Sequence, residues 1–251
     1  MTDVSDDGGI ASIEGSIHLR ITCAILASAA RLVPVPFIDD ILRERITQVV
    51  VKQTLAAHRR SYSSSRLKAI WSDSGGCASG CLLTLFKAPL TLITYPFRKV
   101  WTWIMAVRYL SRDLTTMILL GRALDSSLRL GRLELGDGLE AEAAMWNQAF
   151  DNAVGGMDTR VLTSGLATGI SQVKGLGRAA VRTLRSLWRK KQKGDVTEVE
   201  VPDSEKQVLD DGAQSVQAVL EKPEVIAMLE KFDARFEDNL KVLASRNPEA
   251  W

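Results

Sequence analysis

Apolar residues recur at intervals of three and four along most of this chain, the spacing that places them on one face of an α-helix. Between residues 12 and 32 one such stripe contains Ile13, Ile17, Ile21, Ala24, Ile25, Ser28 and Leu32. A second stripe, in residues 39–60, points inward with Ile41, Leu42, Ile46, Val49, Val50 and Leu55. The alternation typical of a strand is found in VTEVEV at 196–201, which is short and isolated. The pattern therefore predicts an all-α fold.

Proline, glycine and serine mark the ends of the predicted helices. Pro34 and Pro36 end the first stripe, and SYSSS at 61–65 ends the second. Further helices are expected over 98–132, 139–150, 159–192, 204–221 and 223–245, with breaks at 134–138 and 151–158. Glycines at 165, 169, 175 and 177 weaken the first half of 159–192 by roughly 1 kcal/mol each relative to alanine. Pro223 suits the first turn of the last helix.

These elements predict an irregular multi-helix bundle with a C-terminal helical hairpin. We expect a disordered N-terminus over 1–11 and a helical body over 12–192. A polar, proline-bearing linker over 193–204 then leads to an acidic hairpin over 205–251. Within the body, an apolar segment over 77–107 and a basic amphipathic helix over 173–191 stand out.

The charge is distributed unevenly along the chain. The formal net charge is +2. Residues 1–194 carry a net charge of +10, whereas the acidic tail, residues 195–251, carries −8. Such asymmetry predicts a basic body that meets an anionic surface and a tail that stays in water. A solvated imbalance without a partner is the simpler interpretation.

The basic helix over 173–191 separates its charges from its apolar residues. No acidic residue occurs from Thr159 through Gly194, while nine basic residues do. On a helical wheel one arc holds Lys174, Arg178, Arg182, Arg185 and Arg189. The opposite arc holds Val173, Leu176, Ala180, Leu184, Leu187 and Trp188. This composition is typical of a helix that lies in a membrane interface, where anionic lipid attracts each cation by about 1 kcal/mol.

The same wheel permits two other interpretations. The apolar arc can dock on the helix's own domain, leaving the arginines to an acidic partner or to the protein's own acidic tail. Nucleic acid is a weaker fit, because base reading uses polar and aromatic side chains that are scarce among these arginines.

The apolar segment over 77–107 raises the membrane question independently. Lys87 lies near the centre of the most apolar window, which disfavours a span. A shallow insertion fits better, with Lys87 reaching the interface and Arg98, Lys99, Trp101 and Trp103 at headgroup level. The alternative is a helical core segment, and the sequence leaves both open.

No residue pattern indicates a catalytic, cofactor or metal site. Cys77 and Cys81 have neither the spacing of a redox pair nor enough further ligands for zinc, which favours turn packing. Gly165 and Gly169 form a GxxxG pair in a segment too polar to span, which favours close packing between helices. The three cysteines and the acidic first nine residues indicate a cytoplasmic location.

We therefore expect a non-enzymatic helical protein, a scaffold or adaptor, attached peripherally to an anionic membrane surface on its inner, cytoplasmic face. Its acidic hairpin would recruit a protein partner whose identity the sequence does not indicate. The alternative is an all-α protein-interaction domain whose basic helix contacts an acidic partner or its own acidic tail. A helical enzyme is a third class, without a supporting motif or an indicated small-molecule substrate.

Overall fold

The computed structural model describes residues 18, 20–30, 38–60, 63, 65–70, 110–134, 136, 138–191 and 201–246. Within these ranges the fold is all-α, as predicted, and no strand occurs. Residues 20–29 and 110–129 are helical. The other elements are α2 (Ile38–Ala57), the 3-10 helix η2 (Lys68–Ile70), α4 (Leu139–Gly155), α5 (Arg160–Gln172), α6 (Leu176–Lys191), α7 (Asp203–Leu220) and α8 (Pro223–Arg246).

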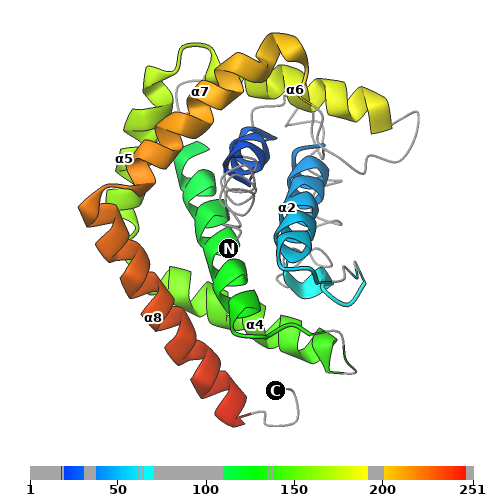
Figure 1. Ribbon diagram of the computed structural model, residues 1–251, viewed down its shortest axis with the longest axis vertical. Coiled ribbons are helices and arrows are strands. Elements are labelled where there is room, and N and C mark those ends of the chain that lie inside the picture. The colour runs from blue at the N-terminus through cyan, green and yellow to red at the C-terminus, as the bar shows by residue number, and fades with distance from the viewer. Residues whose placement is uncertain are drawn as a thin grey trace, which may run out of the picture.

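The later helices curve around the earlier ones (Figure 1). The helical residues 20–29 and 110–129 lie with α2 in the middle of the view, while α5, α7 and α8 follow one side of the molecule. Helix α7 packs against α5 and α6, and α8 packs against α4 and α5. The two consecutive C-terminal helices α7 and α8 also contact each other.

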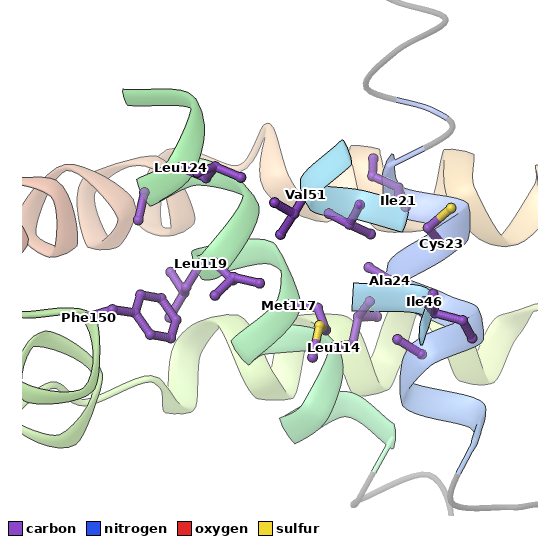
Figure 2. Close-up of a cluster of buried hydrophobic side chains, with 14 of the residues drawn as sticks. Ile21, Cys23, Ala24, Ile46, Val51, Leu114, Met117, Leu119, Leu124 and Phe150 are labelled. Carbon is purple, nitrogen blue, oxygen red and sulfur yellow. The ribbon is translucent and has the colours of Figure 1, made fainter. Parts of the chain in front are cut away.

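The predicted apolar stripes form the central core (Figure 2). In this view Ala24 lies near Ile46 of α2 and Ile21 lies near Val51 of α2, and Leu114 and Met117 from the helical residues 110–129 complete the cluster. All of these side chains are buried, and complete burial of a side chain such as Leu or Ile contributes about 1.5–3 kcal/mol. Ile21, Ala24, Ile25 and Ser28 are buried as predicted, but every other residue over 21–30 is buried too, so this helix is enclosed on all sides and not along one stripe. In α2 the predicted inward positions Ile46, Val50 and Leu55 are buried, and Val49 is half-buried.

An aromatic cluster joins α8 to α4. The Trp146 ring lies edge-on to Phe236 at a centroid distance of 5.5 Å, and Phe150 lies edge-on to Phe232 at 6.1 Å. The indole Nε1 of Trp146 donates a hydrogen bond of 2.8 Å to the Ser127 hydroxyl, so its polar atom is satisfied in the core. Edge-to-face aromatic pairs of this kind contribute about 0.5–1.5 kcal/mol beyond their burial.

The GxxxG pair is the contact between α5 and α7, which confirms the predicted close packing. The Ser215 hydroxyl of α7 donates a 2.9 Å hydrogen bond to the carbonyl of Gly169. A methyl group added to Gly169 would lie 3.3 Å from the carbonyl oxygen of Ser215, and one added to Gly165 would lie 2.9 Å from Val219. The backbones of α5 and α7 can approach this closely because neither glycine has a side chain.

Several predicted boundaries need correction. Helix α4 continues to Gly155, so the break expected from residue 151 begins five residues later. The predicted helix over 159–192 is two helices, because Gly175 adopts a left-handed φ of 86° that a continuous helix does not allow. The last two helices begin and end within one residue of their expected bounds, and Pro223 opens α8 as predicted.

The division into a body and a separate acidic hairpin stays a prediction. What the described residues show is that α7 and α8 pack on α4, α5 and α6. The proposed disordered N-terminus over 1–11 and the apolar segment over 77–107 lie outside the described residues, as does most of the linker over 193–204.

We expect Gly169→Leu to lower the free energy of unfolding by about 1–3 kcal/mol, because the added side chain must displace α7. Gly121 is the control, since a methyl group added there would meet no atom within 4 Å. Gly121→Ala should raise the free energy of unfolding by about 1 kcal/mol through helix propensity alone. Urea unfolding followed by circular dichroism measures both, and an unchanged stability for Gly169→Leu would contradict the close contact.

Candidate functional site

Helix α6 is held by its apolar face. Leu176, Leu184 and Leu187 are buried, as the helical wheel predicts. Leu176 lies over Gly212 of α7, where an added methyl group would be 2.6 Å from a terminal carbon of Leu176 and 3.5 Å from Ile25. The part of the apolar face that these leucines form is therefore packed inside the protein.

The opposite side of α6 exposes its cations. Arg178, Arg182 and Arg185 are exposed on the helix. Lys174 is exposed too, but it lies in the turn before α6 and not on the helix, which corrects the predicted start at 173. We call Lys174, Arg178, Arg182 and Arg185 the basic strip. Trp188 and Arg189 continue the helix, but the structure does not describe their side chains.

One member of the basic strip is paired with the acidic helix α7. The Arg182 Nη1 donates to Oε1 of Glu205 at 3.1 Å. The Glu205 side chain is 9% exposed, whereas that of Arg182 is 67% exposed. The described residues contain no salt bridge to Lys174, Arg178 or Arg185. Sequence reasoning missed Glu205, although the charge difference between the body and the tail was a general signal for such pairs.

Further ion pairs join the basic body to α7 and α8. Arg122 reaches Asp233 of α8 through Nε and Nη2, with the shortest distance 2.6 Å. A second two-point pair, Arg132 with Glu237, has both distances at 2.7 Å. His18 lies 3.1 Å from Asp210 of α7. Part of the charge asymmetry is thus matched within the molecule.

Asp125 is a junction between three segments. Its carboxylate lies 2.9 Å from His58 Nε2, 3.3 Å from Arg20 and 2.8 Å from Arg129. Burial raises the pKa of Asp125, but the hydrogen bond with His58 and the charges of Arg129, Arg20 and His58 outweigh it and bring the pKa below its ordinary value. The contact between His58 and Asp125 joins the end of α2 to the helical residues 110–129.

The buried face of α6 contains a polar atom that the wheel did not single out. Thr183 is fully buried, and its hydroxyl oxygen has no hydrogen-bond partner among the described residues. Thr54 of α2 is equally buried, but its hydroxyl donates to the carbonyl of Val50 at 2.8 Å. Burial of a hydroxyl without a partner is unfavourable, so the apolar packing of this face of α6 has to offset it.

The remaining candidate residues carry no chemistry that the structure describes. Burial raises the pKa of the Cys23 thiol to about 12, which makes it a poor nucleophile at neutral pH. No group of His, Cys, Asp and Glu in the described ranges could hold a metal ion. The predicted contact residues Lys87, Arg98, Lys99, Trp101 and Trp103 lie outside these ranges, as do Cys77 and Cys81.

Among the helices of the described residues, none has the length and apolar content needed to cross a membrane. Searches against protein-family models, curated proteins and solved structures found no match to this chain.

We expect Asp125→Asn to lower the free energy of unfolding at pH 7 by about 1–2 kcal/mol, because the charged hydrogen bonds at the junction are lost. The stabilisation from Asp125 is fully present above the ordinary aspartate pKa of about 4 and is lost as the pH falls through the lower folded-state pKa. Urea unfolding from pH 7 to pH 2 should therefore show the two proteins converging at the acid end. Asp238→Asn, at an exposed position of α8, is the control and should change little at any pH.

Thr183→Val should raise the free energy of unfolding by about 1 kcal/mol, because it removes a buried hydroxyl that lacks a partner and keeps the side-chain shape. The matched variant Thr54→Val removes a hydroxyl that has a partner, so it should give no such gain. Thermal and urea unfolding measure both. A loss of stability in Thr183→Val would show that this face of α6 is not packed as described.

Proposed function

We propose that this protein is a non-enzymatic helical scaffold or adaptor that binds peripherally to an anionic membrane surface through the basic strip. The observation that carries the proposal is the exposure of Lys174, Arg178 and Arg185, none of which has a salt bridge within the described residues, beside a helix anchored by its opposite face. A fixed helix presents its cations together, so little side-chain and backbone order is lost on binding.

The binding is electrostatic and does not need insertion of α6. Leu176, Leu184 and Leu187 are buried in the protein, so these three side chains do not supply the hydrophobic contribution of an interfacial helix. Each basic side chain near an anionic surface contributes about 1 kcal/mol, and the attraction falls off within a Debye length of about 8–10 Å. Three cations of the strip, Lys174, Arg178 and Arg185, have no salt bridge within the described residues, and this number supports weak, reversible and salt-sensitive attachment.

A second candidate function is binding to an acidic protein. The pair between Arg182 and Glu205 favours it, because it shows that the strip accepts a carboxylate from a neighbouring helix at hydrogen-bonding distance. The ion pairs from Arg122 and Arg132 to α8 show the same preference elsewhere on the body. An acidic helix is therefore a ligand that this surface accommodates.

Sedimentation with lipid vesicles tests the first candidate. The full chain should bind vesicles that contain phosphatidylserine at low salt, and should bind neutral phosphatidylcholine vesicles much less. The double variant R178Q/R185Q should lower the partition coefficient about 30-fold, the effect of losing two contacts of about 1 kcal/mol each. Raising the salt concentration to 0.5 M should abolish the difference between the two proteins.

The control carries the same loss of charge on another helix. Lys231 and Lys241 are exposed on α8, so K231Q/K241Q should bind nearly as the unmodified protein does. Equal losses in the two double variants would show that net charge and not the strip is responsible. Absence of binding to anionic vesicles at low salt would remove the membrane proposal, and retention on a polyglutamate column that depends on Arg178 and Arg185 would then favour the acidic-protein candidate.

A further inference from the structure

We infer that Glu205 withholds Arg182 from the basic strip, so that the docking of α7 limits the charge that α6 presents to an anionic surface. This inference rests on the proposed function and concerns the regulation of the same site. The strip then acts with three cations, and the fourth becomes available when the carboxylate of Glu205 is neutralised or moved.

Arg182 lies at the position on α6 from which a strip residue can pair with a carboxylate of α7. On the helical wheel Arg182 lies at one edge of the basic arc, whereas Arg178 and Arg185 lie nearer its centre. Glu205 lies in the first turn of α7, and its Oε1 accepts from Arg182 Nη1 at 3.1 Å. Since α6 and α7 pack together through Leu176 and Gly212, the two side chains are kept within reach of each other.

The unequal exposure of the two partners explains why the pair holds. Arg182 is largely exposed and could be solvated without its partner, but Glu205 is 9% exposed and would become a buried, unpaired charge. Removing one partner of a buried charge pair is far less favourable than breaking an exposed one. A lipid phosphate that binds Arg182 must therefore displace it from Glu205, whereas a phosphate that binds Arg178 or Arg185 displaces no partner in the described residues.

Charge-balanced double variants test the inference in the vesicle assay. R182Q/E205Q leaves the net charge unchanged and replaces the ion pair with two amides that can hydrogen-bond, so its partition should equal that of the unmodified protein. R178Q/D203N also leaves the net charge unchanged, but it removes a free cation of the strip and the exposed carboxylate of Asp203. Its partition should fall about fivefold, the effect of one basic side chain at an anionic surface.

Single variants test the release of Arg182 directly. E205Q and D203N each remove one negative charge from the first turn of α7. E205Q should bind anionic vesicles about fivefold more tightly than D203N, because E205Q alone frees Arg182. Circular dichroism and thermal unfolding confirm that each variant is folded before the comparison. Equal binding by the two single variants, or equal losses in the two double variants, would overturn the inference.

A second measurement does not depend on membrane binding. Phenylglyoxal modifies exposed guanidinium groups, and mass spectrometry can report the rate at each arginine. In the unmodified protein Arg182 should react more slowly than Arg178 and Arg185, and in E205Q the three rates should become similar. If Arg182 and Arg178 react at the same rate in the unmodified protein, the inference is wrong. If Arg182 reacts slowly but the protein does not bind anionic vesicles, the proposed function is wrong and the contact between Arg182 and Glu205 is still supported.

Discussion

The contact between Leu176 of α6 and Gly212 of α7 determines how this molecule displays its charge. Because Gly212 has no side chain, Leu176 and Ile25 of the N-terminal helical residues can both approach the α7 backbone at this position. This contact turns the apolar face of α6 inward. The periodicity of the helix then turns Arg178 and Arg185 outward, whatever surface the protein meets.

Helix α7 also packs closely against α5, again at a glycine. Gly169 of α5 lies against Ser215, so α7 approaches α5 and α6 closely at two separate points. Its neighbour α8 is held by the aromatic cluster and by the pairs from Arg122 and Arg132. The acidic helices α7 and α8 therefore contact the basic body through both apolar packing and ion pairs. Along the sequence, the separation of basic and acidic residues suggests an external partner. In the folded molecule, some of these basic and acidic residues pair with each other.

Local patterns predicted the fold well and the contacts between distant residues poorly. The apolar stripes, the all-α class, the first-turn role of Pro223 and the close packing at Gly165 and Gly169 all follow from spacing within one helix. The break before α6 was missed because a glycine can either lie within a helix or end it, and the sequence does not show which. Gly175 adopts the left-handed conformation that ends the helix. Glu205 was missed as the partner of Arg182 because 23 residues separate them and helical periodicity carries no information over that distance.

An amphipathic basic helix has the same wheel whether its apolar face meets lipid or protein, so the sequence of α6 alone cannot distinguish these cases. What distinguishes them is the burial of Leu176, Leu184 and Leu187. Once that apolar area is used for folding, it no longer contributes to binding, and the side chains that the described part of α6 leaves exposed include Arg178, Arg182 and Arg185. Attachment through cations would act over a Debye length of about 8–10 Å and would weaken as the salt concentration rises. Helix α7 provides the surface on which α6 packs at Gly212, and it also provides the carboxylate that pairs with Arg182. The packing of α6 and the charge that it exposes therefore depend on the same helix.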